Sequence, residues 1–304
     1  MDNLFILPDS YDEKYLDISR CRPLIDNTHE LLIKDIIGKK LFYPEATVLD
    51  ESYIAAGANP SLTRPIFKTF KTEFKRHIAE STLNNITGFD SFIRTDICLG
   101  CTQYIDDLHI KGNVQVLVDE YSYHSRINSD VTIVSVDQLV PGKPLIISFP
   151  FSKIGTAHPR MKEILDICIE KNINIHIDGA WITAAKNLTL DLSHPAIKSF
   201  AVSMSKGYGL SGWNRIGLRW TKEKSEDIIT LMNDYEQIST YSVVIGNYFL
   251  KHLEPDHLWS KHSKNHYKLC SDFNLTSSDT IHMATKNGSV IGLAPLLKLL
   301  EQHV

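Results

Sequence analysis

Apolar residues recur along the middle of the chain in short runs that are separated by stretches of helical spacing. Several runs lack polar alternation, which is typical of strands covered on both faces, as in parallel sheets. Helices are expected at about 102–111 and 158–171. This alternation predicts an α/β fold, a three-layer α/β/α sandwich with a mostly parallel central sheet. The runs are RTDICLG, VQVLVD, VTIVSV, PLIISFP, INIHID, SFAVSMS and RIGLRW.

The two ends of the chain follow other patterns. Residues 1–60 are rich in turn formers, with one expected helix at about 26–38. Apolar residues at helical spacing predict a second helix at about 61–81. The pattern predicts helix from 222 to 252. After it come a polar stretch, an expected strand (DTIHMAT) and an expected helix (LAPLLKLLEQ). A domain change is therefore expected near residues 250–260.

The composition excludes several classes of protein. The 304 residues are 43% hydrophobic and 22% charged, with a net charge of −4. Because lysines and arginines are scattered, we expect no nucleic-acid partner. No window reaches the ~18 apolar residues of a membrane span, and the amino terminus lacks the features of a secretory signal. The sequence therefore predicts a cytoplasmic protein with no membrane partner.

The five cysteines are an odd number and show no repeated metal-binding spacing. Cys98 and Cys101 form a C-x-x-C, a motif that redox centres and halves of zinc sites use. No second cysteine pair follows, and the His-rich segment near 257–266 has no matching pair. We expect reduced cysteines at a strand end and loop and no metal site, with the redox or half-zinc motif as the alternative.

Three expected strands end in groups suited to cofactor chemistry, and ligands of open α/β sheets bind outside the carboxyl ends of the strands. Chemistry with pyridoxal 5′-phosphate (PLP) needs a lysine amine to form an imine and a carboxylate to keep the pyridine nitrogen protonated. It also needs a helix N-terminus with small and hydroxyl residues for the phosphate. The matching residues are Asp178, then Ser203, Ser205 and Lys206, and finally Gly100, Cys101 and Thr102.

The stretch SMSKGYGLSGWNRIG, from Ser203 to Gly217, resembles the cofactor-lysine signature of class I/II aminotransferases, which are PLP enzymes of fold type I. The resemblance covers about residues 50–250. It includes YIAAGANPSLTRPIFKTF and LVDEYSYHS, the latter similar to the family's aromatic stacking strand. It implies an N-terminal segment, a large PLP-binding domain and a small, truncated C-terminal domain formed with the N-terminal segment, at residues 1–50, 51–252 and 253–304.

The resemblance also implies roles for individual residues. Lys206 is the Schiff-base lysine and proton shuttle, and Asp178 pairs with the pyridine nitrogen. Tyr123 stacks on the ring, and Tyr53 reaches the phosphate of the neighbouring subunit in a homodimer. The phosphate-binding residues are Gly100, Cys101, Thr102, Ser203, Ser205 and Arg215. Each has a structural alternative, such as a surface lysine in a Ser/Gly loop, a helix cap or plain aromatic packing.

The sequence departs from the family's pattern around the cofactor ring. Ser152 stands where the family has an asparagine that binds the ring hydroxyl. Trp181 stands where a tyrosine is common, and an indole cannot accept a hydrogen bond. Arg215 follows the lysine by nine residues where eight is usual, and Asn214 takes the expected place. Ser152 and Trp181 would therefore bind the cofactor with fewer contacts to the ring oxygen.

The carboxyl-terminal region is short for this family, and no arginine follows Arg219. A bidentate guanidinium is the usual partner of a substrate carboxylate. Arg22 is our candidate for that role because the family's amino-terminal segment passes near the substrate. The alternatives are Arg20, a lysine of the tail or backbone N–H groups, and Arg22 itself has the alternative of a solvated surface arginine.

The leading hypothesis is an aminotransferase that uses Lys206 to move an amino group between small-molecule donor and acceptor. Two alternatives stay open. One is another PLP reaction on the same scaffold, as in a decarboxylase, lyase or oxidase, which Ser152 and Trp181 favour. The other is a non-catalytic relative that serves as a partner subunit, against which the intact pair of Lys206 and Asp178 argues.

Overall fold

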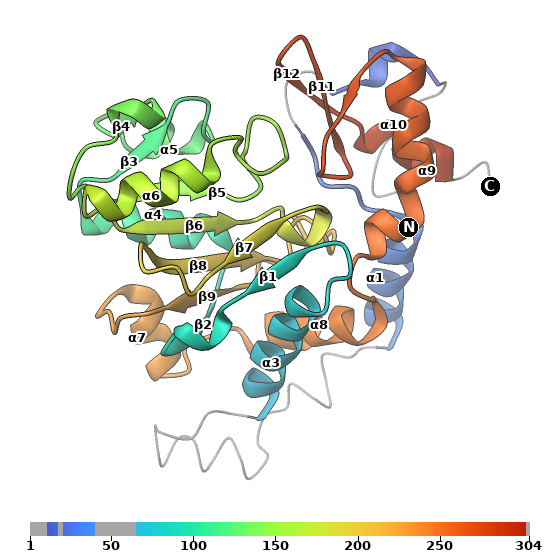
Figure 1. Ribbon diagram of the computed structural model, residues 1–304. Coiled ribbons are helices and arrows are strands. Elements are labelled where there is room, and N and C mark those ends of the chain that lie inside the picture. Colours follow the sequence, from blue (N-terminus) through green and yellow to red (C-terminus); the bar gives the residue numbers. More distant parts are fainter. Residues whose placement is uncertain (1–10, 18–20, 40–64, 302–304) are drawn as a thin grey trace.

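The apolar runs form the strands of one seven-stranded sheet in the computed structural model, which describes residues 11–17, 21–39 and 65–301 (Figure 1). The strand order is β2-β9-β8-β6-β5-β3-β4. Pairing is parallel from β8 to β4, whereas β9 runs antiparallel to β8 and β2. The mostly parallel sheet is therefore confirmed. Its strands are β2 (Arg94–Cys98), β3 (Gln115–Leu117), β4 (Thr132–Val134), β5 (Leu145–Ser148), β6 (Ile175–Gly179), β8 (Ile197–Ser203) and β9 (Gly217–Thr221).

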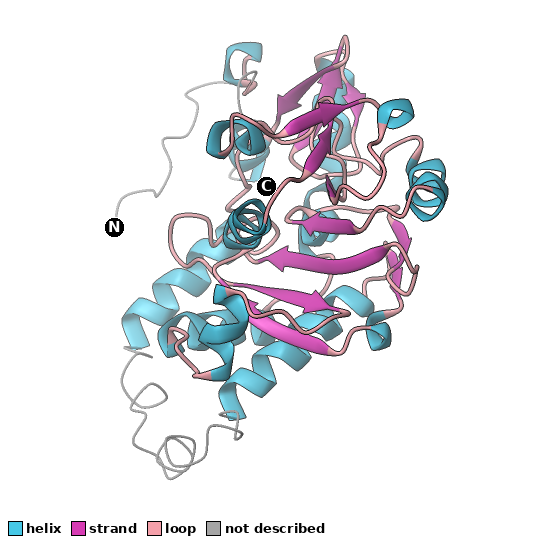
Figure 2. Cartoon of the chain, turned by 90° about the vertical axis from the view of Figure 1, so that its left-hand side faces the viewer, coloured by secondary structure: helices cyan, strands magenta, loops and turns pink. Residues whose placement is uncertain are grey.

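Helices cover both faces of this sheet (Figure 2). Along β5, Leu145 and Ile147 pack on one side with α3, α6 and α8, and Ile146 packs on the other with α4 and α7. Because each face is buried, the strands need no polar alternation, and the three-layer sandwich is confirmed. The helices are α3 (Pro65–Ala79), α4 (Cys101–Lys111), α6 (Met161–Glu170), α7 (Ile228–Asp234) and α8 (Thr240–His252).

The continuous helix expected over residues 222–252 is wrong, since the segment holds two helices, α7 and α8. Asp227 begins α7 by accepting a hydrogen bond from the backbone N–H of Thr230 at 2.7 Å. Glu236 has a φ of 50°, a left-handed conformation that interrupts the helix, and Ser239 caps α8. Local capping and backbone conformation therefore decide the break.

The polar stretch after residue 252 forms a helix that the apolar pattern did not predict. His262 and His266 lie on its buried face, so polar residue types occupy positions that point into the core. A second strand of the C-terminal hairpin was also missed, although Asn287 and Gly288, both at positive φ, form the Asn-Gly turn that marks such hairpins. The C-terminal elements are α9 (His257–Asp272), β10 (Thr276–Ser277), β11 (Met283–Lys286), β12 (Ser289–Gly292) and α10 (Ala294–Glu301).

The amino-terminal segment packs with this C-terminal part, as predicted. Leu16 and Leu24 belong to the hydrophobic cluster that α9, α10 and the hairpin form, and Asp17 pairs with Gly292 through backbone hydrogen bonds of 2.9 and 2.8 Å. The following helix α1 (Asn27–Lys39) contacts α8, one of the helices that cover the sheet. The exact domain bounds stay a prediction.

A buried carboxylate ties α1 to α9. Asp26 caps α1 by accepting from the backbone N–H of His29 at 2.9 Å. Its other oxygen accepts from His257 at 2.9 Å and from His262 at 3.0 Å. Burial favours the neutral carboxyl, but these donors outweigh it and lower the pKa of Asp26. The His-rich segment therefore has a structural role at the junction of the two chain ends.

The remaining elements are short and lie in the connections. None of the helices in the described ranges is long and apolar enough to cross a bilayer. The strands β1 and β7 pair in parallel as a separate small sheet. The elements are β1 (Asn85–Thr87), β7 (Thr189–Asp191), α5 (Tyr123–Ile127), and the 3₁₀ helices η1 (Glu13–Tyr15), η2 (Phe89–Ser91), η3 (Val136–Gln138) and η4 (Ile182–Ala184).

Candidate active site

Three of the predicted strand ends meet at one edge of the sheet. Asp178, near the end of β6, aligns with Ala201 on β8, two residues before Ser203. Gly217 on β9 aligns with Ser203 on one side and with Cys98, the last residue of β2, on the other. The turn from β2 into α4 therefore lies beside the segment that carries Lys206.

The turn at Gly100 accepts only glycine. Its φ of 79° and ψ of −176° fall in a region that residues with a Cβ avoid. A Cβ at this position would lie 2.7 Å from Ser203 Oγ, well inside van der Waals contact. Gly100 also precedes α4, and no side chain caps that helix. The backbone N–H groups of the first turn, around Cys101 and Thr102, are therefore suited to an anion.

Hydroxyl groups line the same turn. Ser203 Oγ donates to Ser205 Oγ at 2.9 Å, and the backbone N–H of Ser205 donates to Ser203 Oγ at 3.1 Å. Both serines are buried. The exposed Arg215 donates to Thr102 Oγ1 at 2.6 Å, which places its guanidinium at the first turn of α4. The structure thus brings together the whole set that the sequence assigned to a phosphate.

Half-buried Lys206 and buried Asp178 lie close enough for each charge to influence the pKa of the other. Burial lowers the pKa of Lys206, and the negative charge of Asp178 only partly opposes this. Burial raises the pKa of Asp178, against hydrogen bonds from the Cys101 thiol and the Ala180 backbone N–H and the charge of Lys206. The Ala180 bond is 3.0 Å. An amine and a carboxyl whose pKa values are both shifted by burial at a strand end are typical of a catalytic site.

Trp181 and a histidine from the C-terminal part lie beside the lysine. Lys206 Nζ is 4.3 Å from the centre of the Trp181 ring. The His282 ring lies 4.4 Å from that of Trp181, and among the described residues neither of its nitrogens has a hydrogen-bond partner. Burial, followed by the charge of Lys206, holds the pKa of His282 far below its usual value. Sequence reasoning missed His282 because a single histidine in a short strand pattern does not indicate a functional site.

The segment after β3 adds a carboxyl group that sequence reasoning also missed. Glu120 accepts from the backbone N–H groups of Ser148 and Tyr121, both at 2.8 Å, and from the Ser148 hydroxyl. Burial raises the pKa of Glu120 to about 7, although the Ser148 bonds oppose the shift and Asp178 adds to it. Ser148 aligns with Asp178 across β5 and β6, so the two acids lie at the same sheet edge.

The expected aromatic strand is wrong in part, since Tyr123 lies in α5 and not in a strand. Its hydroxyl donates to Asp106 on α4 at 2.8 Å. Burial and Asp106 raise the pKa of Tyr123 to about 12. The Tyr121 ring stacks on it at 5.7 Å, and burial and the charge of Asp178 raise the pKa of Tyr121. Of the two tyrosines, Tyr121 is therefore the one whose pKa the charge of Asp178 raises.

The other predicted site residues lie around this centre or outside the described ranges. Ser152 is half-buried in the connection that follows β5. Arg22 is exposed, and its Nε lies 3.2 Å from Asp17. The neighbouring Cys21 has its pKa raised to about 12 by burial and Asp17, against the charge of Lys206, so this segment passes close to the lysine. Tyr53 lies outside the described residues.

Comparisons with known proteins address the fold. Neither a family model nor a curated protein sequence matches this chain. The aspartate aminotransferase from Thermotoga maritima superposes with a TM-score of 0.56 at 15% identity, over 92% of this chain and 97% of the other. The chain therefore has the aminotransferase fold.

Two further structures support this assignment of the fold. The aromatic aminotransferase from Pyrococcus horikoshii matches with a TM-score of 0.54 at 13% identity, over 85% of this chain and 75% of that one. The histidinol-phosphate aminotransferase from Clostridium acetobutylicum matches with a TM-score of 0.54 at 14% identity, over 89% of this chain and 83% of that one. The α/β fold of the aminotransferases is thus confirmed, whereas the reaction is a separate question.

The residues at the sheet edge fit PLP. A phosphate requires a turn without a side chain, and Gly100 supplies one beside the hydroxyls of Ser203 and Ser205. An imine requires an amine with a lowered pKa, which Lys206 offers. A protonated pyridine nitrogen requires a buried carboxyl, which Asp178 offers. Trp181 and Tyr121 add aromatic surface near both groups.

Proposed function

We propose that this chain is a PLP-dependent enzyme that transfers an amino group between two small molecules. The observation that carries the proposal is the position of Lys206, whose charge acts on the buried Asp178, beside the turn at Gly100 that accepts only glycine. These groups come from adjacent strand ends, where an α/β sheet binds its ligand. The aminotransferase fold of the chain supports the same chemistry as an analogy.

Lys206 would act as nucleophile and as proton carrier. Because burial lowers its pKa, more of the amine is neutral near pH 7, and only the neutral amine can attack a carbonyl or accept a proton. Bound PLP supplies an electron sink for negative charge at the substrate α-carbon. Lys206 Nζ, held 4.3 Å from the centre of the Trp181 ring, would accept the proton from that carbon and carry it.

Asp178 and the α4 turn would hold the cofactor in place. The carboxylate of Asp178 would pair with the protonated pyridine nitrogen, while the Ala180 N–H and the Cys101 thiol orient its oxygens. The phosphate would lie at the start of α4, bound by N–H groups, the two serines and Arg215. Tyr121 is better placed than Tyr123 to stack on the ring, because Asp106 holds the Tyr123 hydroxyl.

The absence of an arginine after Arg219 affects how a substrate carboxylate would bind. Arg22 remains the proposed partner of the carboxylate. The charge of Lys206 acts on the pKa of the neighbouring Cys21, so the segment that carries Arg22 lies close to the lysine. A substrate carboxylate would have to compete with Asp17, which pairs with Arg22 at 3.2 Å. We therefore expect weak recognition of free α-amino acids and propose an amine, an amino sugar or a carrier-bound molecule as the substrate.

Covalent labelling tests the assignment of Lys206. The purified protein, incubated with PLP and reduced with borohydride, should carry a pyridoxyl group on Lys206 by mass spectrometry. Lys206→Ala should lose this adduct, whereas Lys162→Ala, a change of an exposed lysine on α6, should keep it. An adduct on a different lysine of the native protein would overturn the assignment.

A panel of amines and amino acids tests the reaction type. Transamination converts the cofactor to its aminated form, which is visible as a loss of the imine absorption band. If a substrate releases carbon dioxide or ammonia while the cofactor keeps its aldehyde, a lyase or decarboxylase replaces this proposal. Trp181, which cannot accept a hydrogen bond from the cofactor, is the feature that favours that second candidate.

A further inference from the structure

A cavity lies at the other ends of the parallel strands from Lys206. Its volume is about 710 Å³, within the range of small-molecule sites. His176, near the start of β6, and Ser199, near the start of β8, line it, whereas Asp178 and Ser203 end the same strands at the other edge. Nothing in the proposed transamination uses this cavity.

Cationic side chains dominate its lining. The charged lining residues are Lys111, Lys143, Lys198, Lys224 and Arg219, against Asp107 and Glu223. Part of this charge is compensated, because Lys198 pairs with Glu223 at 3.1 Å. Within the described ranges, Lys143 and Lys224 have no carboxylate partner. Two lysine charges at the cavity are therefore uncompensated.

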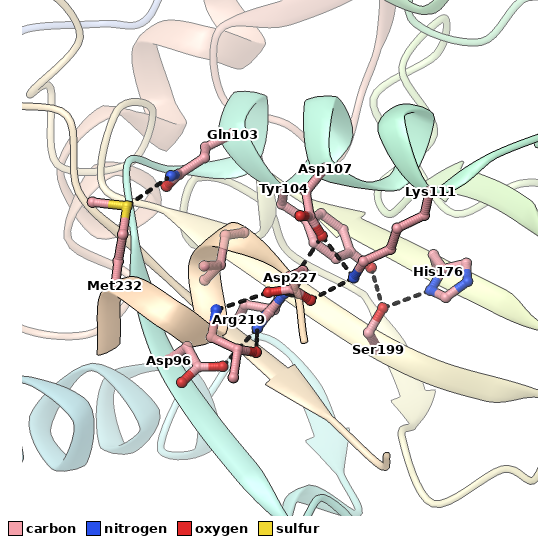
Figure 3. Close-up of polar contacts among 12 residues, drawn as sticks. Asp96, Gln103, Tyr104, Asp107, Lys111, His176, Ser199, Arg219, Asp227 and Met232 are labelled. Atoms are coloured by element: carbon pink, nitrogen blue, oxygen red, sulfur yellow. Dashed lines mark hydrogen bonds and ion pairs between the residues drawn. The ribbon is translucent and has the colours of Figure 1, made fainter. Parts of the chain in front are cut away.

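A buried network of two cations and three carboxylates holds the floor of the cavity in place (Figure 3). Arg219 donates to Asp96 at 2.7 Å and to Asp227 at 2.6 Å, with all three side chains almost fully buried. Lys111, at the end of α4, pairs with Asp107 at 2.8 Å and also with Asp227. Because these ions are held by several partners, the cavity is preorganised and a ligand would not have to order it.

His176 adds a neutral donor with a defined tautomer. The Tyr104 hydroxyl lies 2.5 Å from Ser199 Oγ, which lies 2.7 Å from His176 Nδ1 (Figure 3). Every proton in this buried chain finds an acceptor only if Tyr104 donates to Ser199 and Ser199 donates to Nδ1, which leaves the His176 proton on Nε2. Burial, followed by Lys111 and Lys198, lowers the pKa of His176 to about 4, so the ring is neutral at pH 7.

We infer that this cavity binds a small, multiply charged anion of the phosphate class, with Lys143 and Lys224 at its rim and His176 as a hydrogen-bond donor. Lysines bind phosphate as point charges, and a fixed imidazole N–H adds direction. The volume suits a phosphorylated metabolite and not a macromolecule. The site is separate from the phosphate position proposed at Gly100, because the two lie at opposite ends of β6 and β8.

Calorimetric titration of the full-length protein with pyrophosphate tests the inference. PLP is present at saturation to fill any phosphate site at Gly100, and sodium chloride keeps the ionic strength constant. The double variant Lys143→Gln/Lys224→Gln should bind pyrophosphate about tenfold more weakly, since each lost charge-assisted contact weakens binding severalfold. Glu223→Gln, which frees Lys198, should bind about twofold to threefold more tightly, an outcome that misfolding cannot produce.

The matched control is Lys162→Gln/Lys264→Gln, which removes the same charge from exposed positions outside the cavity. It should bind pyrophosphate like the native protein. An equal loss of pyrophosphate affinity in both double variants would show that net charge alone causes the effect, and would overturn the inference. So would the absence of pyrophosphate binding to the native protein at millimolar concentration. Either result leaves the PLP proposal untouched, because that proposal is read from the adduct on Lys206.

Discussion

Replacing Gly100 with alanine would test the geometry of the α4 turn. The backbone at φ 79° and ψ −176° costs about 2 kcal/mol for a residue with a Cβ. The new Cβ would lie 2.7 Å from Ser203 Oγ, so this hydroxyl must move and its bond to Ser205 is lost, at about 1 kcal/mol. The free energy of unfolding should therefore fall by about 3 kcal/mol, a large share of a typical 5–15 kcal/mol.

Urea unfolding followed by circular dichroism measures this change, with Gly288→Ala as the matched control. Gly288 also has a positive φ, 75°, but nothing lies within 4 Å of its ideal Cβ. The control should lose only the backbone contribution of about 1–2 kcal/mol. If Gly100→Ala destabilises the protein no more than Gly288→Ala does, the turn is not packed against Ser203 as described. Affinity for PLP should also fall in Gly100→Ala alone.

Three further predictions concern the site and the assembly. Asp178→Asn should leave PLP bound but lower turnover by about 100-fold or more, because an unprotonated pyridine withdraws electrons poorly; unchanged turnover, compared with the exposed control Asp119→Asn, would exclude Asp178 as the ring partner. Glu120 has a folded pKa of about 7 against 4.5 when unfolded, so its charged form is disfavoured in the fold, and stability should fall by about 2–3 kcal/mol as the pH rises from 4.5 to 7. Glu120→Gln should flatten that part of the stability profile in unfolding experiments at several pH values, and a slope equal to that of the native protein would contradict the assignment. Light scattering should find a homodimer, as two-fold assemblies are common and the resemblance implies one; a monomer with full PLP occupancy would refute it.

Much of the central layer could be predicted from the sequence because its signals are local. Continuous apolar runs marked all seven strands of the sheet, since burial on both faces removes the polar alternation. The helix α9 escaped prediction because His262 and His266 on its buried face are polar by type. His262 finds its partner Asp26 236 positions away, and His266 finds the backbone carbonyl of Ile281 15 positions away, outside the helix. No pattern within the helix could therefore show that these histidines are satisfied in the core.

The sequence by itself determined the residues that are close along the chain or follow a spaced motif. Lys206, Ser203 and Ser205 belong to one segment, and Gly100 and Cys101 form one strand-to-helix turn. The tertiary structure alone decided which side chains change the properties of that site, because burial and charge act through space.

His282 reaches Trp181 across about a hundred residues of chain, and Glu120 approaches Asp178 from a different strand connection. The cationic cavity likewise combines the ends of α4, β6, β8 and β9, which are distant in sequence and adjacent only in the folded sheet. A pattern in the sequence reports how one residue relates to its neighbours along the chain, whereas a pKa or a cavity depends on every group within several ångströms.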